Sequence, residues 1–355
     1  MADRRKIEEI RARTGELDLE ILKLLERRAR LAKEIGALRA EVANPVLLQR
    51  ERLAALASSA SGELPPESIL TVFKAIHAVC ASLEGPPRIA FVGPEGSFGF
   101  VATRQTFGPG VLALAVETPA QAFDELARGR VDYAIAPYES SQEGPVLSTI
   151  LALKQTDLVV IGQCEMQAGL ALLNRTGNLA DIEKVYASAH DHASSHTFLA
   201  SRLPRASVID VRSPTIACQF AAEDHGGAAL AHDAIGELHG LAVVLPNVGD
   251  EPDLRMRFAV IGTRPAPRSG NDVTSLVFTL NDEPGALLAV LGYFAKRGIN
   301  VKNVMSRPVV GEGWDYIFYA DVLGHATDRV LVAAFDDIKK STRFFKVLGS
   351  YPAQS

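Results

Sequence analysis

The chain has 355 residues, of which 47% are hydrophobic and 22% are charged, and its formal net charge is −5. This length exceeds one ordinary hydrophobic core and predicts two or three domains. The acidic balance argues against a broad basic surface for nucleic acid or a membrane, so any anion-binding site must be a local group of Arg or Lys side chains.

The apolar runs and the cysteines of the chain predict where the protein is located. No apolar stretch follows the charged amino-terminal residues, and no apolar run reaches the roughly 20 residues of a membrane span. Cys80, Cys164 and Cys218 are far apart, and none belongs to a CxxC pair or has a His at metal-ligand spacing. We therefore expect a cytoplasmic protein with buried free thiols, no metal and no other cofactor.

A long amphipathic helix is predicted from residue 4 to about residue 41. Apolar side chains recur there at three- and four-residue steps: Ile7, Ile10, Leu17, Ile21, Leu24, Leu25, Leu31, Ile35 and Leu38. A helix of about 38 residues would be roughly 57 Å long, which requires a partner over much of its length. Further helices are expected over about 46–57 and 67–83, separated by a Ser/Gly/Pro-rich linker. Three such helices make a poor monomeric core and predict an intertwined homodimer.

The pattern changes after Pro87. Short β-rich runs then alternate with helical ones over about 175 residues, which predicts an α/β domain; the expected strands are 89–92, 111–116, 133–136, 158–161, 185–187, 242–245 and 257–261. After a second linker at 265–272, the order strand–helix–strand–strand–helix–strand predicts a ferredoxin-like α+β unit. Its expected elements are 274–280, 285–297, 300–306, 316–322, 327–338 and 342–348.

Three arginines interrupt the apolar stripe of the first helix. Arg28 and Arg39 are eleven residues apart and lie about 20° apart around a helix, whereas Arg11 points about 100° away from Arg28. One helix cannot aim all three at one ligand, but a dimer can if Arg11 serves the partner's site. The alternative is that they are solvated arginines of a charged helix.

Together with Asp18 and the pair Arg50–Glu51, the spacing of these arginines resembles the all-helical chorismate mutase family over about 80 residues. The resemblance implies a pericyclic rearrangement of chorismate to prephenate, in which the enzyme holds the dianion in a compact conformer and stabilises the charge on its ether oxygen. It implies that Arg28 and the partner's Arg11 clamp the two carboxylates. The implied site is Arg11, Arg28, Arg39, Arg50, Glu51 and Glu84.

The resemblance implies roles for two glutamates, and this sequence departs from the family at two other positions. Glu51 would accept a hydrogen bond from the ring hydroxyl, and Glu84 would face the ether oxygen, where a protonated carboxyl favours activity at lower pH. Arg39 replaces a family Lys and changes the donor geometry. Leu47 replaces a family Asp, so one contact is missing.

Residues 88–264 resemble prephenate dehydratase, a two-lobed α/β domain similar to periplasmic binding proteins. The motifs that carry the resemblance are GPEGSF at 93–98, PYESS at 137–141, the segment 185–199 and MRF at 256–258. The resemblance implies a prephenate pocket formed by Ser97, Glu139, Ser140, Ser141, Ala187, Ser194, Met256 and Arg257.

The scaffold positions of these motifs are kept, but reactive positions are replaced. Ser140 occupies the position of a family Asn, and Ser194 that of a family Gln. Ala187 and Ser188 replace a Ser-His pair of the family. Met256 stands for the Thr that is the favoured proton donor, and a thioether cannot donate a proton. Since dehydration requires an acid at the leaving hydroxyl, we expect it to be impaired or altered. The simpler interpretation of Met256 is that it fills a packed gap.

New polar residues occupy the same segment, namely His190, Asp191, His192 and His196. The i, i+4 spacing of His192 and His196 would suit a metal if both lay on one helix. The alternative, a polar helix start, agrees with the expectation of no metal.

Residues 273–351 resemble an ACT domain of the phenylalanine-sensing kind, through DEPGALL at 282–288 and SRP at 306–308. The resemblance implies an effector site at Gly285, Ala286, Leu287, Ser306 and Arg307. Met305 replaces a family Glu, which weakens the assignment of phenylalanine as effector, and a purely structural ACT dimer is the alternative.

The expected divisions are a helical mutase at 1–84, the dehydratase-like domain at 88–264 and the ACT domain at 273–355. We expect a chorismate mutase of phenylalanine biosynthesis that binds chorismate and prephenate as a homodimer or higher homo-oligomer, with no nucleic acid or membrane partner. Three alternatives stay open: a fully bifunctional enzyme in which Ser140, Ser141 or Ser194 replaces the lost groups, a prephenate decarboxylase-like lyase, and a non-catalytic ligand-binding module.

Overall fold

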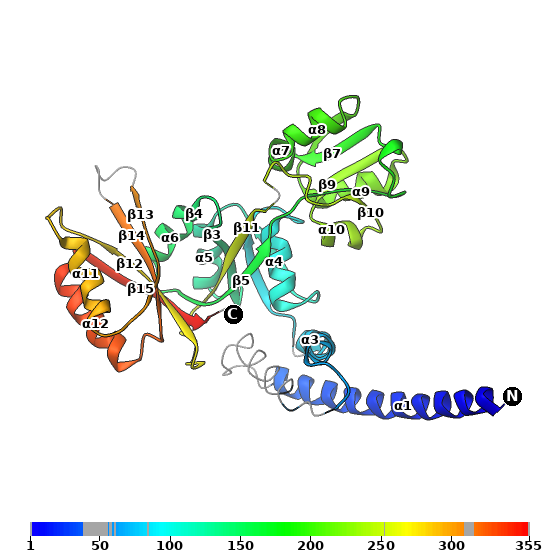
Figure 1. Ribbon diagram of the computed structural model, residues 1–355, viewed down its shortest axis with the longest axis horizontal. Helices are drawn as coiled ribbons and strands as arrows, with labels where there is room; N and C mark the ends of the chain where they lie inside the picture. The colour runs from blue at the N-terminus through cyan, green and yellow to red at the C-terminus, as the bar shows by residue number, and fades with distance from the viewer. Residues whose placement is uncertain are drawn as a thin grey trace. The chain divides into compact units, whose positions relative to one another are not determined.

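The computed structural model describes residues 2–37, 56, 59, 62–83, 85–251, 253–308 and 316–353. These residues form two compact units: Met1–Pro87 with Phe107–Leu112, and the remainder of the chain (Figure 1). Each unit has its own architecture. Among the described residues, no helix combines the length and apolar character that a membrane crossing requires.

The first unit is helical. Helix α1 spans Ala2–Ala37 and contacts α3, which spans Pro66–Leu83. The predicted helix at 46–57 lies outside the described residues except for residue 56. Among the α1 side chains whose burial is described, only Ala32 is buried, at 4% exposure, and Leu25, Arg28 and Ala29 beside it are half-buried. Most of the apolar stripe is exposed in the single chain: Ile7, Ile10, Leu17, Ile21, Leu24, Leu31 and Ile35.

The first lobe of the second unit is a six-stranded sheet in the order β2-β1-β3-β11-β5, with β4 paired to β3. The strands are β1 (Arg88–Val92), β2 (Leu112–Val116), β3 (Tyr133–Ser140), β4 (Gly144–Pro145), β5 (Val159–Gln167) and β11 (Arg255–Gly262). The helices are α4 (Phe98–Phe107), α5 (Pro119–Ala127) and α6 (Leu147–Lys154). Strands β1 and β3 run parallel, and β11 returns antiparallel between β3 and β5.

The chain builds the second lobe between β5 and β11. Its sheet has the order β10-β6-β9-β7-β8, from β6 (Ala171–Asn174), β7 (Lys184–Ser188), β8 (Ser207–Val211), β9 (Gly227–Ala231) and β10 (Ala242–Leu245). The helices are α7 (Ala189–Ala193), α8 (His196–Arg202), α9 (Pro214–Glu223) and α10 (Asp233–Leu238). Strands β6, β8 and β9 were not predicted from the sequence.

The carboxyl-terminal domain is an antiparallel sheet in the order β13-β14-β12-β15. It contains β12 (Asp272–Thr279), α11 (Ala286–Ala295), β13 (Val301–Pro308), β14 (Tyr316–Leu323), α12 (Arg329–Ser341) and β15 (Phe344–Pro352). This confirms the predicted ferredoxin-like order.

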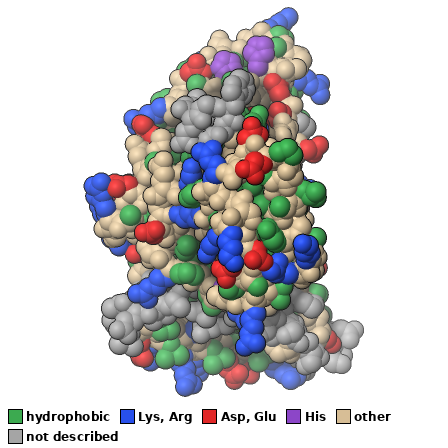
Figure 2. Space-filling view, turned by 90° about the vertical axis from the view of Figure 1, so that its left-hand side faces the viewer, with side chains coloured by type: hydrophobic (Ala, Val, Ile, Leu, Met, Phe, Trp, Pro, Cys, Tyr) green, Lys and Arg blue, Asp and Glu red, His purple; other side chains and the backbone are tan. Residues whose placement is uncertain are grey.

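On the face shown in Figure 2, basic and acidic side chains are interspersed and form no extended field of one sign.

The two faces of this small sheet have different neighbours. Leu276 and Phe278 point toward α11 and α12 and share a core with Val290 and Phe335. Val277, which alternates with them, joins a core shared with the first lobe, together with Tyr138, Val160, Tyr319, Leu348 and Tyr351. The carboxyl-terminal domain is therefore packed on the first lobe through the sheet face that carries no helices.

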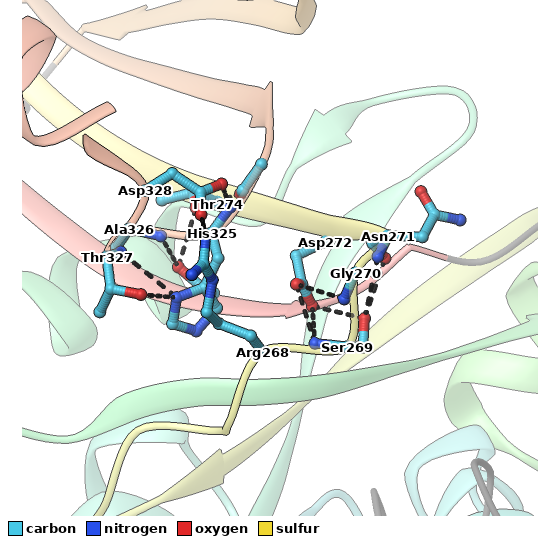
Figure 3. Close-up of polar contacts among 12 residues, drawn as sticks. Arg268, Ser269, Gly270, Asn271, Asp272, Thr274, His325, Ala326, Thr327 and Asp328 are labelled. Carbon is cyan, nitrogen blue, oxygen red and sulfur yellow. Dashed lines mark hydrogen bonds and ion pairs between the residues drawn. The ribbon is translucent and has the colours of Figure 1, made fainter. Parts of the chain in front are cut away.

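The predicted linker at 265–272 is held by specific polar contacts (Figure 3). The Nε2 atom of His325 lies 3.1 Å from the Ala266 carbonyl, and the Thr327 amide donates to Nδ1 at 3.2 Å. Since Nδ1 accepts, Nε2 carries the proton and donates to the linker. Arg268 forms an ion pair with Asp328, and the Asp272 carboxylate accepts from the Ser269 amide at 2.9 Å. These contacts fix the point at which the chain enters β12.

Candidate functional site

The described part of the helical unit places one predicted site residue at its internal interface. Arg28 donates to the Ile76 carbonyl at 3.2 Å and contacts Nδ1 of His77 at 3.1 Å. Both groups belong to α3 and are uncharged when the imidazole is neutral, and among the described residues Arg28 has no carboxylate partner. Within the described part of the unit, its positive charge is therefore not neutralised by a carboxylate. Arg11 is exposed on α1; the remaining predicted residues, Arg39, Arg50, Glu51 and Glu84, together with Leu47, lie outside the described residues.

A second candidate site lies between the two lobes. The parallel strands β1 and β3 of the first lobe and β7 and β8 of the second end in loops that carry the motif residues. A cavity of about 380 Å³ separates the β1 loop from the start of α9 and is lined by Pro94, Glu95, Arg212, Ser213, Thr215, Ile216 and Gln219. Ligands of open α/β sheets bind at the carboxyl ends of the strands, so this cleft is a candidate ligand site.

The cleft explains one glycine and reveals one segment that the sequence analysis missed. Gly96 has φ +84°, and a Cβ atom there would lie 2.7 Å from the backbone nitrogen of Thr215. Ser213 caps α9 by accepting from the Ile216 amide, and Pro214 occupies its first turn. This Ser-Pro helix-start signal was present in the sequence. Arg212 beside it provides a cation at the cleft.

Ser140 and Met256 are brought together at the end of the first sheet. They are cross-strand register partners on β3 and β11, and such neighbours have Cβ atoms about 4.5–5.5 Å apart. The Ser140 hydroxyl oxygen accepts from the Gln142 amide at 3.3 Å, so its proton can be donated elsewhere. Ser141 pins the strand end, because its Oγ accepts from the Arg255 amide at 3.1 Å. Ser97 directly precedes α4, and its hydroxyl oxygen accepts from the Phe100 amide at 3.5 Å.

Glu139 and Arg257 do not share this location. Arg257 Nη1 donates to Glu139 Oε2 at 2.8 Å, and Arg257 Nε donates to Glu165 Oε2 at 3.2 Å. They are the register pair next to Met256 and Ser140, so the pleat directs them to the opposite face of the sheet. Asn303 of the carboxyl-terminal domain donates to Glu139 Oε1 at 3.3 Å, which identifies that face. The single pocket expected from the motifs is thus divided between two faces.

Two predicted pocket residues of the second lobe, Ala187 and Ser194, make contacts that stabilise the lobe itself. Ala187 is fully buried in a core cluster with Val185 and Leu230. The Ser194 carbonyl, at the end of α7, accepts from the Asp250 amide at 2.6 Å.

The polar residues near α7 form caps and pairs. Ser188 caps α7 by accepting from the Asp191 amide, and its hydroxyl donates to Asp191 Oδ2 at 2.6 Å. Asp191 is 4% exposed, and burial raises the pKa of its carboxyl group. His192 pairs with Asp210 at 3.0 Å, while His196 begins the separate helix α8. The two histidines therefore do not form one turn of one helix, which removes the geometric basis for a metal site there.

The predicted effector positions lie on two elements. Gly285, with φ +84°, is the N-cap of α11, and Ala286 and Leu287 begin that helix. Ser306 and Arg307 lie on β13, with Ser306 exposed and Arg307 half-buried. Met305, at the replaced Glu position, lies beside Gly144 of the first lobe, as does Arg307.

Comparisons with known proteins agree with these three parts. The family model for chorismate mutase type II matches residues 10–85, that for prephenate dehydratase matches residues 89–266, and that for the ACT domain matches residues 274–339. A bifunctional chorismate mutase/prephenate dehydratase of Aquifex aeolicus is 33% identical over 98% of both chains.

Two solved structures cover 75% of this chain, each with a TM-score of 0.62. One is a prephenate dehydratase from Arthrobacter aurescens in complex with L-Phe, which is 29% identical and covered over 90% of its length. The other is described as GqqA, a novel type of quorum-quenching acylase, which is 28% identical and covered over 98%. The predicted fold classes and their order are confirmed, and the chain belongs to the bifunctional chorismate mutase/prephenate dehydratase family of enzymes.

Proposed function

We propose that the helical unit converts chorismate to prephenate and that Arg28 is the ligand-binding cation that carries this activity. Arg28 is half-buried at the α1–α3 interface and has no carboxylate partner among the described residues. A guanidinium in this state can form two charge-assisted hydrogen bonds to a substrate carboxylate. Arg11, Arg39, Arg50, Glu51 and Glu84 complete the proposed site, with Arg11 supplied by a partner chain.

We further propose that the chain acts as a homodimer or higher homo-oligomer through α1. The exposed apolar stripe of this helix includes Leu17 at 58% and Leu24 at 65% exposure, and such a stripe requires a covering surface. A second copy of α1 offers the same apolar surface. The oligomeric mass in solution tests this, and the variant Leu24→Asp should yield monomers.

For the two-lobed domain we propose a prephenate site whose dehydration step is impaired. The supporting observation is the residue at the strand end: Met256 takes the position of the family's proton donor and is the register partner of Ser140. Dehydration breaks the C–O bond of the ring hydroxyl while the ring carboxylate leaves as CO2, and the departing oxygen needs a proton. The Met256 thioether has none to give.

Full bifunctionality is the second candidate, and one contact favours it. The Ser140 hydroxyl oxygen accepts from the Gln142 amide, so its proton remains available beside Met256. Ser141 and Ser194 are the other hydroxyls proposed as substitutes. The full-length similarity to bifunctional relatives also supports this candidate.

Product identity after incubation with prephenate at neutral pH separates these candidates. We expect phenylpyruvate to form no faster than the acid-catalysed background. Phenylpyruvate well above background would establish full bifunctionality and contradict the impaired step. A decarboxylated, non-aromatic product would indicate a decarboxylase-like lyase, and the failure of both prephenate and chorismate to react would leave a non-catalytic binding module.

The remaining assignments are proposals of the same kind. We propose L-phenylalanine as the effector of the ACT domain, at Gly285, Ala286, Leu287, Ser306 and Arg307. The L-Phe complex of the Arthrobacter aurescens relative supports this ligand. We propose the divisions 1–84, 88–264 and 273–355. We also propose a cytoplasmic location, since none of the three cysteines takes part in a disulfide.

A further inference from the structure

Strand β13 of the ACT domain presents alternating faces. Asn303, Met305 and Arg307 are half-buried, whereas Lys302, Val304 and Ser306, which alternate with them, are exposed. The half-buried face lies on the β3–β4 turn, because a Cβ atom on Gly144 would be 2.9 Å from Sδ of Met305 and 3.3 Å from Nη2 of Arg307. The proposed effector strand thus contacts the lobe that carries Ser140 and Met256.

A β-bulge directs two neighbouring residues of β3 toward this strand. Arg257 pairs with Glu139 and Phe258 pairs with Pro137, so Tyr138 is the extra residue between them. A bulge lets consecutive side chains share one face. Tyr138 accordingly stacks edge-on against Tyr319 of β14 with ring centroids 5.6 Å apart, while Glu139 reaches Asn303.

Glu139 joins the two domains through its two oxygens. Oε1 accepts from Asn303 Nδ2 of the ACT domain at 3.3 Å, and Oε2 accepts from Arg257 Nη1 of β11 at 2.8 Å. The Glu139 side chain is only 18% exposed, so water competes little for these bonds. Arg257 is held on its other side by Glu165 of β5 at 3.2 Å. The result is a continuous ladder from β13 across the three strands β3, β11 and β5.

We propose that Asn303 is a positioning residue that couples the ACT domain to the prephenate site. By holding one oxygen of Glu139, it fixes the Glu139–Arg257 pair and thereby the strand ends that carry Ser140 and Met256 on the opposite face. A movement of β13, which also carries Ser306 and Arg307, is transmitted through this hydrogen bond. The inference rests on the proposed prephenate site for its functional consequence, but the coupling is a property of the strands themselves.

The sharpest test replaces Asn303 by Asp in the full-length chain. Asp has the same shape, so packing is kept, but it cannot donate when ionised and faces the Glu139 carboxylate. We expect amide hydrogen exchange at 137–141 and 255–258 to accelerate about tenfold or more and prephenate affinity to fall about tenfold, consistent with the loss of a charge-assisted hydrogen bond. Asn303→Gln, which keeps an amide donor, should restore part of both. Val304→Asp is the matched control, because it adds the same charge on the exposed face of the same strand.

Two readouts keep this inference separate from the proposed function. If exchange at 137–141 and 255–258 in Asn303→Asp equals that in Val304→Asp, the coupling is wrong whatever the domain binds. If exchange accelerates but the wild-type chain binds no prephenate by calorimetry, the coupling stands and the proposed prephenate site fails. If exchange accelerates while prephenate affinity is unchanged from wild type, the strands are coupled but the transmission to the site is overturned.

Discussion

The helical unit and the two-lobed domain differ in how far they bury their apolar side chains and pair their arginines. In the helical unit, α1 leaves most of its apolar stripe exposed, and Arg28 has no carboxylate partner among the described residues. In the two-lobed domain, the cores are closed and Arg257 is neutralised by Glu139 and Glu165. The first unit thus leaves an apolar surface and a guanidinium without an opposite charge among the described residues, which motivates the proposed second copy and substrate. The second unit buries its apolar side chains and pairs the charge of Arg257 within the chain.

The substitution with the largest expected effect removes the guanidinium of Arg28 in the first unit. Replacing Arg28 by Ala should reduce mutase kcat/KM more than about 100-fold, because a preorganised charge on the substrate is worth roughly 3–4 kcal/mol. Initial rates of chorismate loss measure this. Arg27→Ala, which removes an exposed neighbouring arginine, is the control and should stay close to wild type. Equal rates for the two variants would remove the carboxylate-clamp assignment.

The next effect tests the replaced position of the second domain. Met256→Thr should increase phenylpyruvate formation from prephenate by about 100-fold, the lower range for a positioned general acid. Met256→Val is the matched control, since it has the shape of Thr without the hydroxyl. If Thr and Val behave alike, a missing proton donor is not what limits the reaction.

The packing of the second unit should also be sensitive at one glycine. A Cβ atom on Gly349 of β15 would lie 2.7 Å from the backbone nitrogen of Val160 on β5, and backbone cannot move aside cheaply. Gly349→Ala should lower the free energy of unfolding by about 3 kcal/mol. Gly292→Ala in α11 meets open space and should raise it by about 0.5–1 kcal/mol. Urea unfolding of both variants measures the contrast, which would fail if Gly349→Ala were neutral.

The smallest expected effect is a pH dependence at the interface between the first lobe and the ACT domain. Burial raises the pKa of Asp321, although Ser275 and Tyr319 donate hydrogen bonds to its carboxyl group. Because the unfolded chain releases this proton at lower pH than the folded chain does, wild-type stability falls as pH rises above the unfolded value. The melting-temperature advantage of Asp321→Asn over wild type should therefore be larger at pH 7 than at pH 4. Asp253→Asn, at an exposed position, should show no such trend.

The sequence predicted elements that have a clear period or motif. The apolar repeat of α1 and the strand–helix order of the ACT domain were both recognisable. Strands β6 and β9 escaped prediction because they are fully buried runs of four and five residues without alternation.

In the candidate site, too, the sequence predicted which residues belong together but not how they are arranged on the sheet. The resemblance to prephenate dehydratase implied one pocket for Glu139, Ser140, Met256 and Arg257, but it could not assign them to faces of a sheet. That assignment depends on the antiparallel register and on the bulge at Tyr138, which are set by pairing between strands more than 100 residues apart. The contact of Asn303 with Glu139 depends on tertiary packing and has no local sequence signal.

One measurement tests the contrast between the two catalytic regions most directly. Purified full-length chain is given chorismate at neutral pH, and prephenate and phenylpyruvate are followed by mass over the same time course. The account predicts that prephenate accumulates nearly in step with chorismate loss, while phenylpyruvate stays at the acid-catalysed background. Phenylpyruvate that keeps pace with chorismate loss would contradict it, and would show that the second domain retains the full reaction without the missing donor.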